Sequence, residues 1–185
     1  IMKVNIKELI ATEFSGMKRA VCANLPYYIT SPVIMYLLES EIDVDAITVM
    51  VQKEAAQRLC AEVGTREAGA ITAAVRYYGE AEMLFQVSRG SFMPAPNVDS
   101  AVIQIRPADT IKQLVEDKDI FFKVIKSGFS QRRKTMANSL SSLLGISKEN
   151  LYNIFDEMGI TRTVRIEQLS IEQLAEFSNI LKSLM

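Results

Sequence analysis

Every stretch of this sequence with a strand pattern lies before Pro107, and the residues after it carry only helical patterns. The run 46–51 is continuous, apolar and β-branched, which is typical of a strand buried on both faces of a parallel sheet. The alternating runs 83–87 and 98–106 predict an antiparallel pair at a sheet edge, joined by a proline-rich loop. We therefore expect an α/β sheet domain followed by a small all-helical domain.

The predicted boundary between these domains lies near Asp109, which gives domains at 1–109 and 110–185. The first 14 residues predict a strand end plus a helix or turn. Ser31 is a plausible N-cap for a helix at 31–40, with Pro32 in its first turn. The other predicted helices span 52–61, 69–78, 119–129, 133–144, 148–158 and 171–184, and the last two have Ser147 and Ser170 as N-caps.

The composition excludes several classes of chemistry. The 185 residues contain no histidine, which removes Ser-His-Asp and Cys-His nucleophile systems and nearly every zinc site. Cys22 and Cys60 are far apart and fit reduced cytoplasmic thiols better than a disulfide. No apolar run approaches the roughly 18 residues that span a bilayer. The net charge of −1 means that any nucleic acid must bind through a local basic patch.

The most informative stretch joins a strand to a proline turn. The apolar run 20–23 predicts a buried strand that ends in Asn24. Pro26 stops the ladder and pushes Leu25 to extended geometry, which tends to leave the Leu25 carbonyl free. Two accepting oxygens, from Asn24 and Leu25, and a flat face on Tyr27 suit a planar base with an exocyclic amine. The alternative is an ordinary proline turn followed by two core tyrosines.

Two further stretches bear on such a site. Phe92, in the rigid loop 91–96, predicts either a second stacking surface or a core plug under the loop. A base held between Tyr27 and Phe92 would gain about 1–3 kcal/mol of stacking. Lys53 and Glu54 begin a helix at the end of a strand, where they form either a solvated pair or a surface that faces substrate.

The segment 130–135 is the one dense basic cluster. It places Arg132, Arg133 and Lys134 in a predicted first helical turn, where positive charge opposes the helix macrodipole. Contact with phosphate explains that placement, and a solvated helix start is the alternative. Lys126 is near the cluster in sequence, and Arg89 precedes the Phe92 loop.

Four motifs occur in order across the chain. Asn24 to Pro32 resembles the NLPYxIxxP motif of the KsgA-type rRNA adenine N6,N6-dimethyltransferases. Gln52 to Leu59 resembles that family's QKExxxRL, and Phe92 to Val102 resembles its FxPxPxVDSAV. Phe129 to Leu140 resembles its FxQRRKTxxNSL. The first motif alone is loosely shared with DNA adenine methyltransferases, but the ordered set of four is highly specific.

The resemblance implies a Rossmann-like methyltransferase domain, a helical rRNA-binding domain and S-adenosylmethionine as methyl donor. Its implied reaction is dimethylation of two adjacent adenines of small-subunit rRNA on the immature 30S subunit. The implied catalytic residues are Asn24, Leu25, Pro26, Tyr27 and Phe92, and Asn24 also contacts the cofactor. The residues that we expect to bind RNA are Arg132, Arg133, Lys134, Lys126, Arg89, Lys53 and Arg58.

The family's N-terminal part has no counterpart in this sequence. No two of the eight glycines in this sequence are spaced as GxG or GxxG, so the sequence lacks the family's glycine-rich cofactor loop. We therefore expect a later part of a longer protein, with the strand at 20–23 left open on one side and prone to self-association. As it stands, the chain is expected to be inactive.

Two other functions also fit the sequence. One is the related Erm type, which methylates large-subunit rRNA; Leu25 and the segment 131–135 favour the KsgA type. The other is a non-catalytic RNA-binding or ribosome-assembly module.

Overall fold

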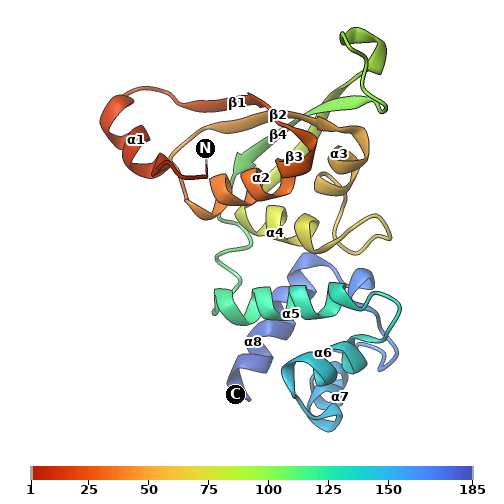
Figure 1. Ribbon diagram of the computed structural model, residues 1–185. Helices are drawn as coiled ribbons and strands as arrows, with labels where there is room; N and C mark the ends of the chain where they lie inside the picture. The colour runs from red at the N-terminus through yellow and green to blue at the C-terminus, as the bar shows by residue number, and fades with distance from the viewer. Residues whose placement is uncertain (1, 185) are drawn as a thin grey trace. The chain divides into compact units, whose positions relative to one another are not determined.

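The computed structural model describes residues 2–184 (Figure 1). The chain divides into two compact units. The first comprises Ile1–Cys60 and Tyr78–Ala108, and the second comprises Ala61–Tyr77 and Asp109–Met185. The segment 61–77 thus groups with the C-terminal helices, although it precedes the last two strands in the chain. No helix within residues 2–184 has the length and apolar character needed to cross a membrane.

A four-stranded mixed sheet forms the first unit, in the order β1-β2-β4-β3. Its strands are β1 (Ala20–Asn24), β2 (Ala46–Gln52), β3 (Gly79–Val87) and β4 (Ser100–Pro107). β1 runs parallel to β2, and β4 runs antiparallel to both β2 and β3. The predicted α/β class is confirmed, and so is the antiparallel pair at the sheet edge.

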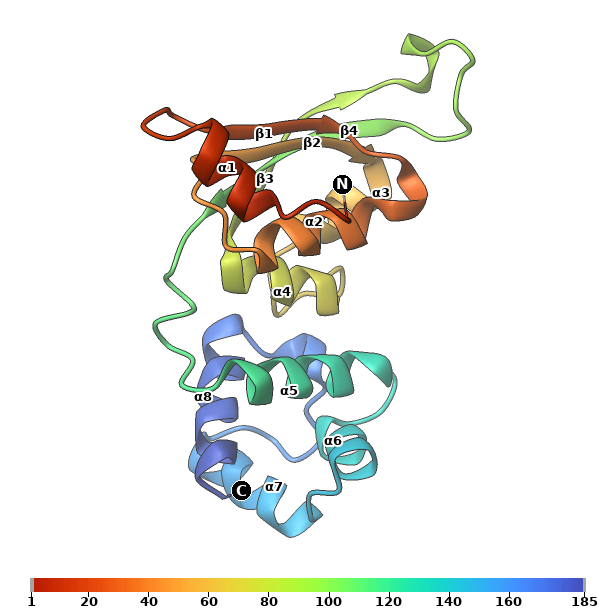
Figure 2. The same cartoon turned by 60° about the vertical axis from the view of Figure 1, so that its left-hand side comes forward.

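One face of the sheet carries the core of this unit. The register pairs Ile47 with Ile105, Val49 with Ile103 and Val51 with Ala101, and all six side chains are buried. Both ribbon views place α2 (Thr30–Glu39) and α3 (Lys53–Leu59) on one side of the sheet (Figures 1 and 2). Burial of each large aliphatic side chain contributes about 1.5–3 kcal/mol. The residues between them in β2 are only half-buried, so the prediction of burial on both faces is wrong.

Two other local predictions in this unit need correction. The run 20–23 is not a buried strand: its exposure alternates between exposed and half-buried, because β1 is an edge strand of the sheet among the described residues. Ser31 is not an N-cap. A short 3₁₀ turn, η1 (Tyr27–Ile29), leads directly into α2, and the N-cap position is Ile29.

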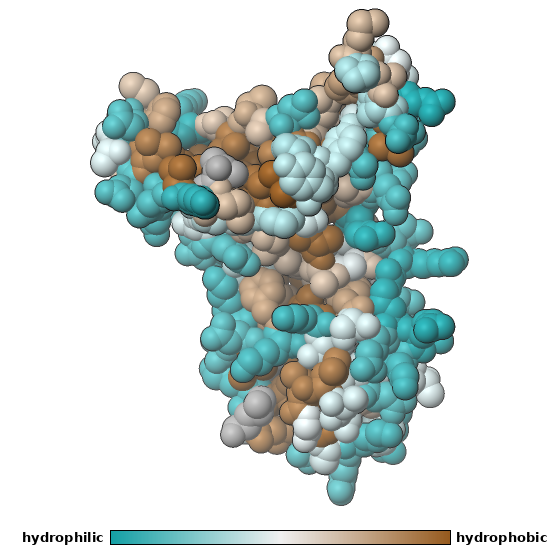
Figure 3. All heavy atoms as spheres, viewed as in Figure 1, coloured by the Kyte–Doolittle hydropathy of each residue, from teal (hydrophilic) through white to brown (hydrophobic). Residues whose placement is uncertain are grey.

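The N-terminal segment also contributes a helix. α1 (Ile6–Glu13) begins at Asn5, whose side chain accepts a hydrogen bond from the main-chain NH of Glu8. The large apolar side chains of this segment that remain exposed are Met2, Val4, Leu9, Phe14 and Met17. Figure 3 shows the corresponding apolar surface over α1.

The second unit is helical. Its elements are α4 (Ala70–Tyr78), α5 (Lys118–Ser130), α6 (Met136–Leu144), α7 (Lys148–Glu157), η3 (Ile166–Gln168) and α8 (Ile171–Ser183). Phe121, Phe155 and Phe177 are fully buried and fill its core. Ser147 and Ser170 cap α7 and α8 as predicted, because each hydroxyl accepts an NH from the first turn.

The predicted helix at 133–144 begins three residues late. Residues 131–134 form a turn, and α6 begins at Met136 with Thr135 as its N-cap. The Thr135 hydroxyl accepts from the main-chain NH of Asn138. The basic side chains therefore do not lie in a first helical turn, and the macrodipole argument for them is wrong.

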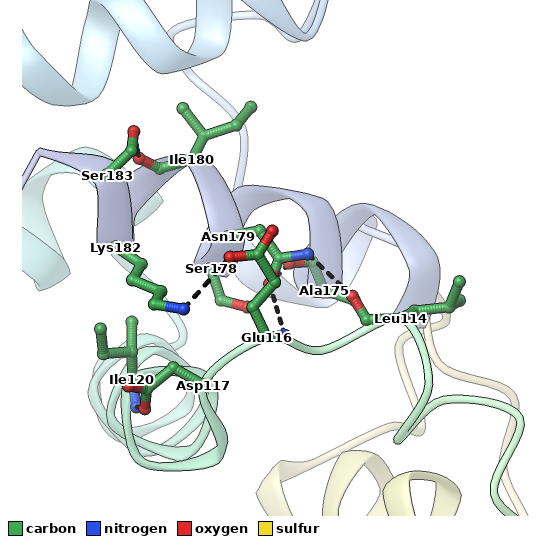
Figure 4. A network of polar contacts seen from close by, with 10 residues as sticks. All are labelled: Leu114, Glu116, Asp117, Ile120, Ala175, Ser178, Asn179, Ile180, Lys182 and Ser183. Carbon is green, nitrogen blue, oxygen red and sulfur yellow. Dashed lines mark hydrogen bonds and ion pairs between the residues drawn. The ribbon is translucent and has the colours of Figure 1, made fainter.

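The segment before α5 is tied to α8 by a polar network (Figure 4). Asn179 accepts from the main-chain NH of Glu116 at 3.0 Å and donates to the carbonyl of Leu114 at 2.7 Å. The Glu116 carboxylate forms an ion pair with Lys182 at 3.2 Å. Asp117 then caps α5 through the NH of Ile120. These bonds fix the direction in which the chain enters α5.

Candidate functional site

The segments that carry the first three motifs meet at one edge of the sheet. Asn24 is opposite Met50 where β1 and β2 end, and Ser100, at the start of β4, is opposite both Gln52 and Val87. The carboxyl ends of β2 and β3 therefore flank the first residue of β4, and the carboxyl end of β1 lies next to β2 at the same edge. Chemistry in open α/β sheets is commonly placed at this edge.

Asn24 to Pro26 form an abrupt strand end. Asn24 is the last residue of β1 and is exposed. The ladder continues for one residue, because the NH of Leu25 donates to the Met50 carbonyl at 3.2 Å, and the Leu25 side chain is buried. Pro26, with φ −56° and ψ 131°, then turns the chain into η1. Asn24 is thus exposed at the sheet edge, next to Leu25, which is held by its hydrogen bond to Met50 and by burial of its side chain.

The two tyrosines have different environments. Tyr27 is half-buried, and its hydroxyl lies 2.7 Å from the hydroxyl of Ser100, which is fully buried. Tyr28 is 86% exposed. The alternative of two core tyrosines does not fit this arrangement. One ring is fixed beside the end of β1, and the other lies in solvent.

Phe92 lies in the long loop between β3 and β4. It follows the short turn η2 (Arg89–Ser91) and is half-buried, whereas its neighbour Met93 is fully exposed. The peptide bond between Met93 and Pro94 is cis. The Arg89 NH donates to a carboxylate oxygen of Asp99 at 2.9 Å, which ties the start of this loop to the residue before β4.

A pocket of about 470 Å³ opens beside these residues. It is lined by Gln52, Lys53, Glu54, Gln57, Arg89, Asn97, Val98 and Asp99. Two of the predicted RNA-binding cations, Lys53 and Arg89, therefore share one pocket. Arg58 is not among its lining residues; its guanidinium lies 3.5 Å from Glu54 one helical turn earlier.

The remaining predicted RNA-binding residues lie in the second unit. Arg132, Arg133 and Lys134 line a pocket of about 590 Å³ together with Phe129, Ser130 and Gln131. Arg133, Lys134 and Lys126 are exposed. Arg132 is instead held within the unit, because its guanidinium pairs with Glu167 at 2.9 Å and donates to the Arg66 carbonyl at 2.6 Å.

Sequence reasoning missed three residues that hold these groups in place. Ser100 bonds Tyr27, Asp99 bonds the Arg89 main chain, and Glu167 holds Arg132. Asp99 and Ser100 lie inside the third motif, so their membership of that motif could have identified them from the sequence. Glu167 lies outside all four motifs. Among the described residues, no group of three or more acidic or cysteine side chains is placed to hold a metal ion.

The sequence matches a known family. The family model for ribosomal RNA adenine dimethylase matches residues 1–183. The chain is 45% identical over 183 residues to ribosomal RNA small subunit methyltransferase A of Clostridioides difficile, and 43% identical to that of Geobacillus thermodenitrificans. The alignments cover 99% and 100% of this chain but only 63% and 64% of those proteins.

Two solved structures resemble this fold. A dimethyladenosine transferase from Plasmodium falciparum matches with a TM-score of 0.71 at 24% identity, covering 91% of this chain and 68% of that one. The 23S rRNA methyltransferase ErmE matches with a TM-score of 0.65 at 19% identity, covering 98% and 80%. These likenesses show a Rossmann-like fold, and the family match shows membership. The chain belongs to the ribosomal RNA adenine dimethylase family.

Proposed function

We propose that the protein containing this chain transfers methyl groups from S-adenosylmethionine to N6 of two adjacent adenines of small-subunit rRNA. The observation that carries the proposal is the placement of Asn24, Leu25 and Tyr27 at the carboxyl edge of the sheet, with the Tyr27 ring anchored to Ser100. Relatives named ribosomal RNA small subunit methyltransferase A support the substrate.

The acceptor chemistry follows from these groups. The lone pair of adenine N6 is delocalised into the ring and must be redirected toward the incoming methyl group. The Asn24 side-chain oxygen and the Leu25 carbonyl accept the two N6 protons and favour a tetrahedral nitrogen. Tyr27 and Phe92 hold the base in line by stacking. Positioning and electrostatics therefore supply the catalysis, and no histidine is needed.

The residues of this chain fit only the methyl-accepting side of such a site. When bound, S-adenosylmethionine supplies an electrophilic methyl group on a sulfonium. Asn24, exposed at the end of β1, is the residue here that we assign to contact with it. The sequence has no glycine-rich loop to cradle the rest of the cofactor, so we propose that residues outside this chain do so.

We assign substrate RNA contacts to both units. Lys53 and Arg89 line the pocket beside the acceptor edge, where they are placed to meet phosphates that flank the target adenines. In the helical unit, the exposed Arg133, Lys134 and Lys126 serve as phosphate contacts, which makes this unit the rRNA-binding domain. We assign a further phosphate contact to Arg58, which lies on α3.

Small and large ribosomal subunits distinguish the candidate functions. The full-length protein should convert adenines of small-subunit rRNA to N6,N6-dimethyladenosine and leave large-subunit rRNA unmodified. Modification of the large subunit alone would favour an Erm-type enzyme. RNA binding without any methyl transfer would favour a ribosome-assembly module. Titration with S-adenosylmethionine separates that last case, because a non-catalytic module has no need to bind it.

The open edge of β1 and the apolar surface over α1 support self-association of this chain (Figure 3). An edge strand offers a row of unpaired main-chain groups to a second strand. Sedimentation should show dimers or larger species at high concentration, and a strictly monomeric profile would count against this.

The rRNA substrate and the two free cysteines support a cytoplasmic location.

A further inference from the structure

Three segments of the acceptor site converge on two adjacent residues, Asp99 and Ser100. The Tyr27 hydroxyl lies 2.7 Å from the Ser100 hydroxyl. The Asp99 carboxylate accepts the Arg89 NH at 2.9 Å, and its main-chain carbonyl accepts the Lys53 NH at 3.0 Å. The segments that follow β1, β2 and β3 therefore all bond to Ser100, the first residue of β4, or to Asp99 just before it.

Ser100 is well placed to act as a fixed point. It pairs with Gln52 on one side and with Val87 on the other, so two ladders set its main-chain position. Its side chain is fully buried, and leaving a buried hydroxyl unpaired costs about 1–3 kcal/mol. The Tyr27 hydroxyl is the partner that satisfies it. The position of the Tyr27 ring is thereby coupled to a residue that is paired with a strand on each side.

We propose that Ser100 is a positioning residue for methyl transfer, acting through its hydrogen bond to Tyr27, while Asp99 positions the loop that carries Phe92. This inference rests on the proposed function. Without the bond, the Tyr27 ring is free to change its tilt and the base that stacks on it follows. A misplacement of about 1 Å can lower a rate by about 100-fold.

The second methyl transfer depends on this positioning more than the first. Its acceptor nitrogen already carries a methyl group, so fewer orientations bring the lone pair in line with the donor. A loosened Tyr27 ring should therefore raise the ratio of monomethyl to dimethyl product. RNA affinity should change little, because phosphate contacts come from other side chains.

The test uses the full-length protein with S-adenosylmethionine and immature small subunits. Ser100→Ala and Tyr27→Phe each remove one partner of the bond, and each should lower kcat about tenfold or more with KM for the subunit within about twofold. Both should increase the monomethyladenosine fraction. The double variant should be no slower than the slower single variant, because the two changes remove one interaction.

Thr48→Val is the matched control. It breaks the 3.0 Å hydrogen bond between Gln104 and Thr48, which also joins two side chains across β2 and β4 but lies away from the site edge. It should lower the melting temperature as Ser100→Ala does, yet leave kcat and the product ratio unchanged. Equal kinetic losses in this control would reduce Ser100 to a structural role and overturn the proposal.

A spectroscopic measurement tests the hydrogen bond between Tyr27 and Ser100 independently of enzyme activity. In the full-length protein labelled with 3-fluorotyrosine, the Tyr27 signal is assigned by its loss in Tyr27→Phe. Its chemical shift should move in Ser100→Ala and stay unchanged in Thr48→Val. An unmoved signal, wild-type kinetics in Ser100→Ala, or multiplying losses in the double variant would each overturn the proposal. A wild-type protein that methylates no rRNA would remove the proposed function, and the positioning role with it, even if the signal moves.

Discussion

Arg132 and Glu167 form an ion pair of 2.9 Å, and the same guanidinium donates to the carbonyl of Arg66. The arginine at the centre of the fourth motif is therefore joined to two distant parts of the helical unit. Its neighbours Arg133 and Lys134 are exposed. A basic motif that reads as uniform in sequence thus combines one structural cation with two that are available to a ligand.

Replacing both exposed cations should weaken RNA binding without harming the fold. For Arg133→Ala with Lys134→Ala, the slope of log affinity against log salt concentration should fall by about two, since each phosphate contact contributes about one. Binding of small-subunit RNA at several salt concentrations measures this slope. The melting temperature should stay within about 2 °C of the wild type.

Arg132→Ala provides the contrasting variant. It should lower the melting temperature, because Glu167 is left largely covered without its partner and the Arg66 carbonyl loses a donor. If Arg132→Ala kept full stability but lost RNA affinity, Arg132 would act mainly in RNA binding, and its contacts to Glu167 and the Arg66 carbonyl would contribute little to stability.

Gly79 permits a close approach between two strands. A Cβ at this position would clash with the Arg106 carbonyl oxygen, which belongs to the paired main chain of β4. Gly79→Ala should therefore destabilise the protein by about 1–3 kcal/mol, as overpacking does. Gly90→Ala is the control, since its Cβ would meet only the Ser88 hydroxyl at 3.7 Å. Urea denaturation of both variants checks the difference, and equal stabilities would contradict the packing argument.

The two cysteines should differ in reactivity. Burial, with a smaller effect from the Glu82 carboxylate, raises the pKa of Cys60 to about 11, whereas Cys22 is exposed. Since the thiolate is the nucleophile, iodoacetamide at pH 8 should label Cys22 well before Cys60. Peptide mass spectrometry over time gives both rates. Faster labelling of Cys60 would show that its surroundings open readily.

The same shift has a consequence for stability. The folded thiol of Cys60 ionises near pH 11, above its ordinary pKa of 9.0, so the folded state binds more protons between these values. The free energy of unfolding should therefore fall as pH rises from about 9 to 11. Cys60→Ser should flatten this part of the pH profile, as measured by urea denaturation. An unchanged slope would place the origin of any alkaline instability elsewhere.

The strands were predictable because each pattern has a single physical cause. The β-branched run at 46–51 and the alternation of Ala101, Ile103 and Ile105 reflect burial against helices on one face. Ser147 and Ser170 were predictable as caps because a hydroxyl before a helix satisfies a local NH. Patterns of this kind can be recognised from a few consecutive residues.

One failure depended on a neighbouring turn, and two depended on distant parts of the chain. Ser31 is not a cap because the turn after Pro26 extends directly into α2. Residues 131–134 are not helical; they form a turn whose Arg132 is anchored to Glu167 and to the Arg66 carbonyl, groups remote in sequence. Likewise, nothing near Tyr27 indicates that its hydroxyl meets Ser100, 73 residues later. The motifs located the candidate site, but its internal bonds required the fold.

The decisive measurement is mass spectrometry of nucleosides from immature small subunits treated with S-adenosylmethionine and either the full-length protein or its Asn24→Ala variant. The wild type should produce N6,N6-dimethyladenosine at two adjacent positions. The variant should lose at least about 100-fold in rate, because one of the two acceptors for the N6 protons is gone. Dimethylation by Asn24→Ala at the wild-type rate, or no methylated adenine with the wild type, would contradict the proposed acceptor site.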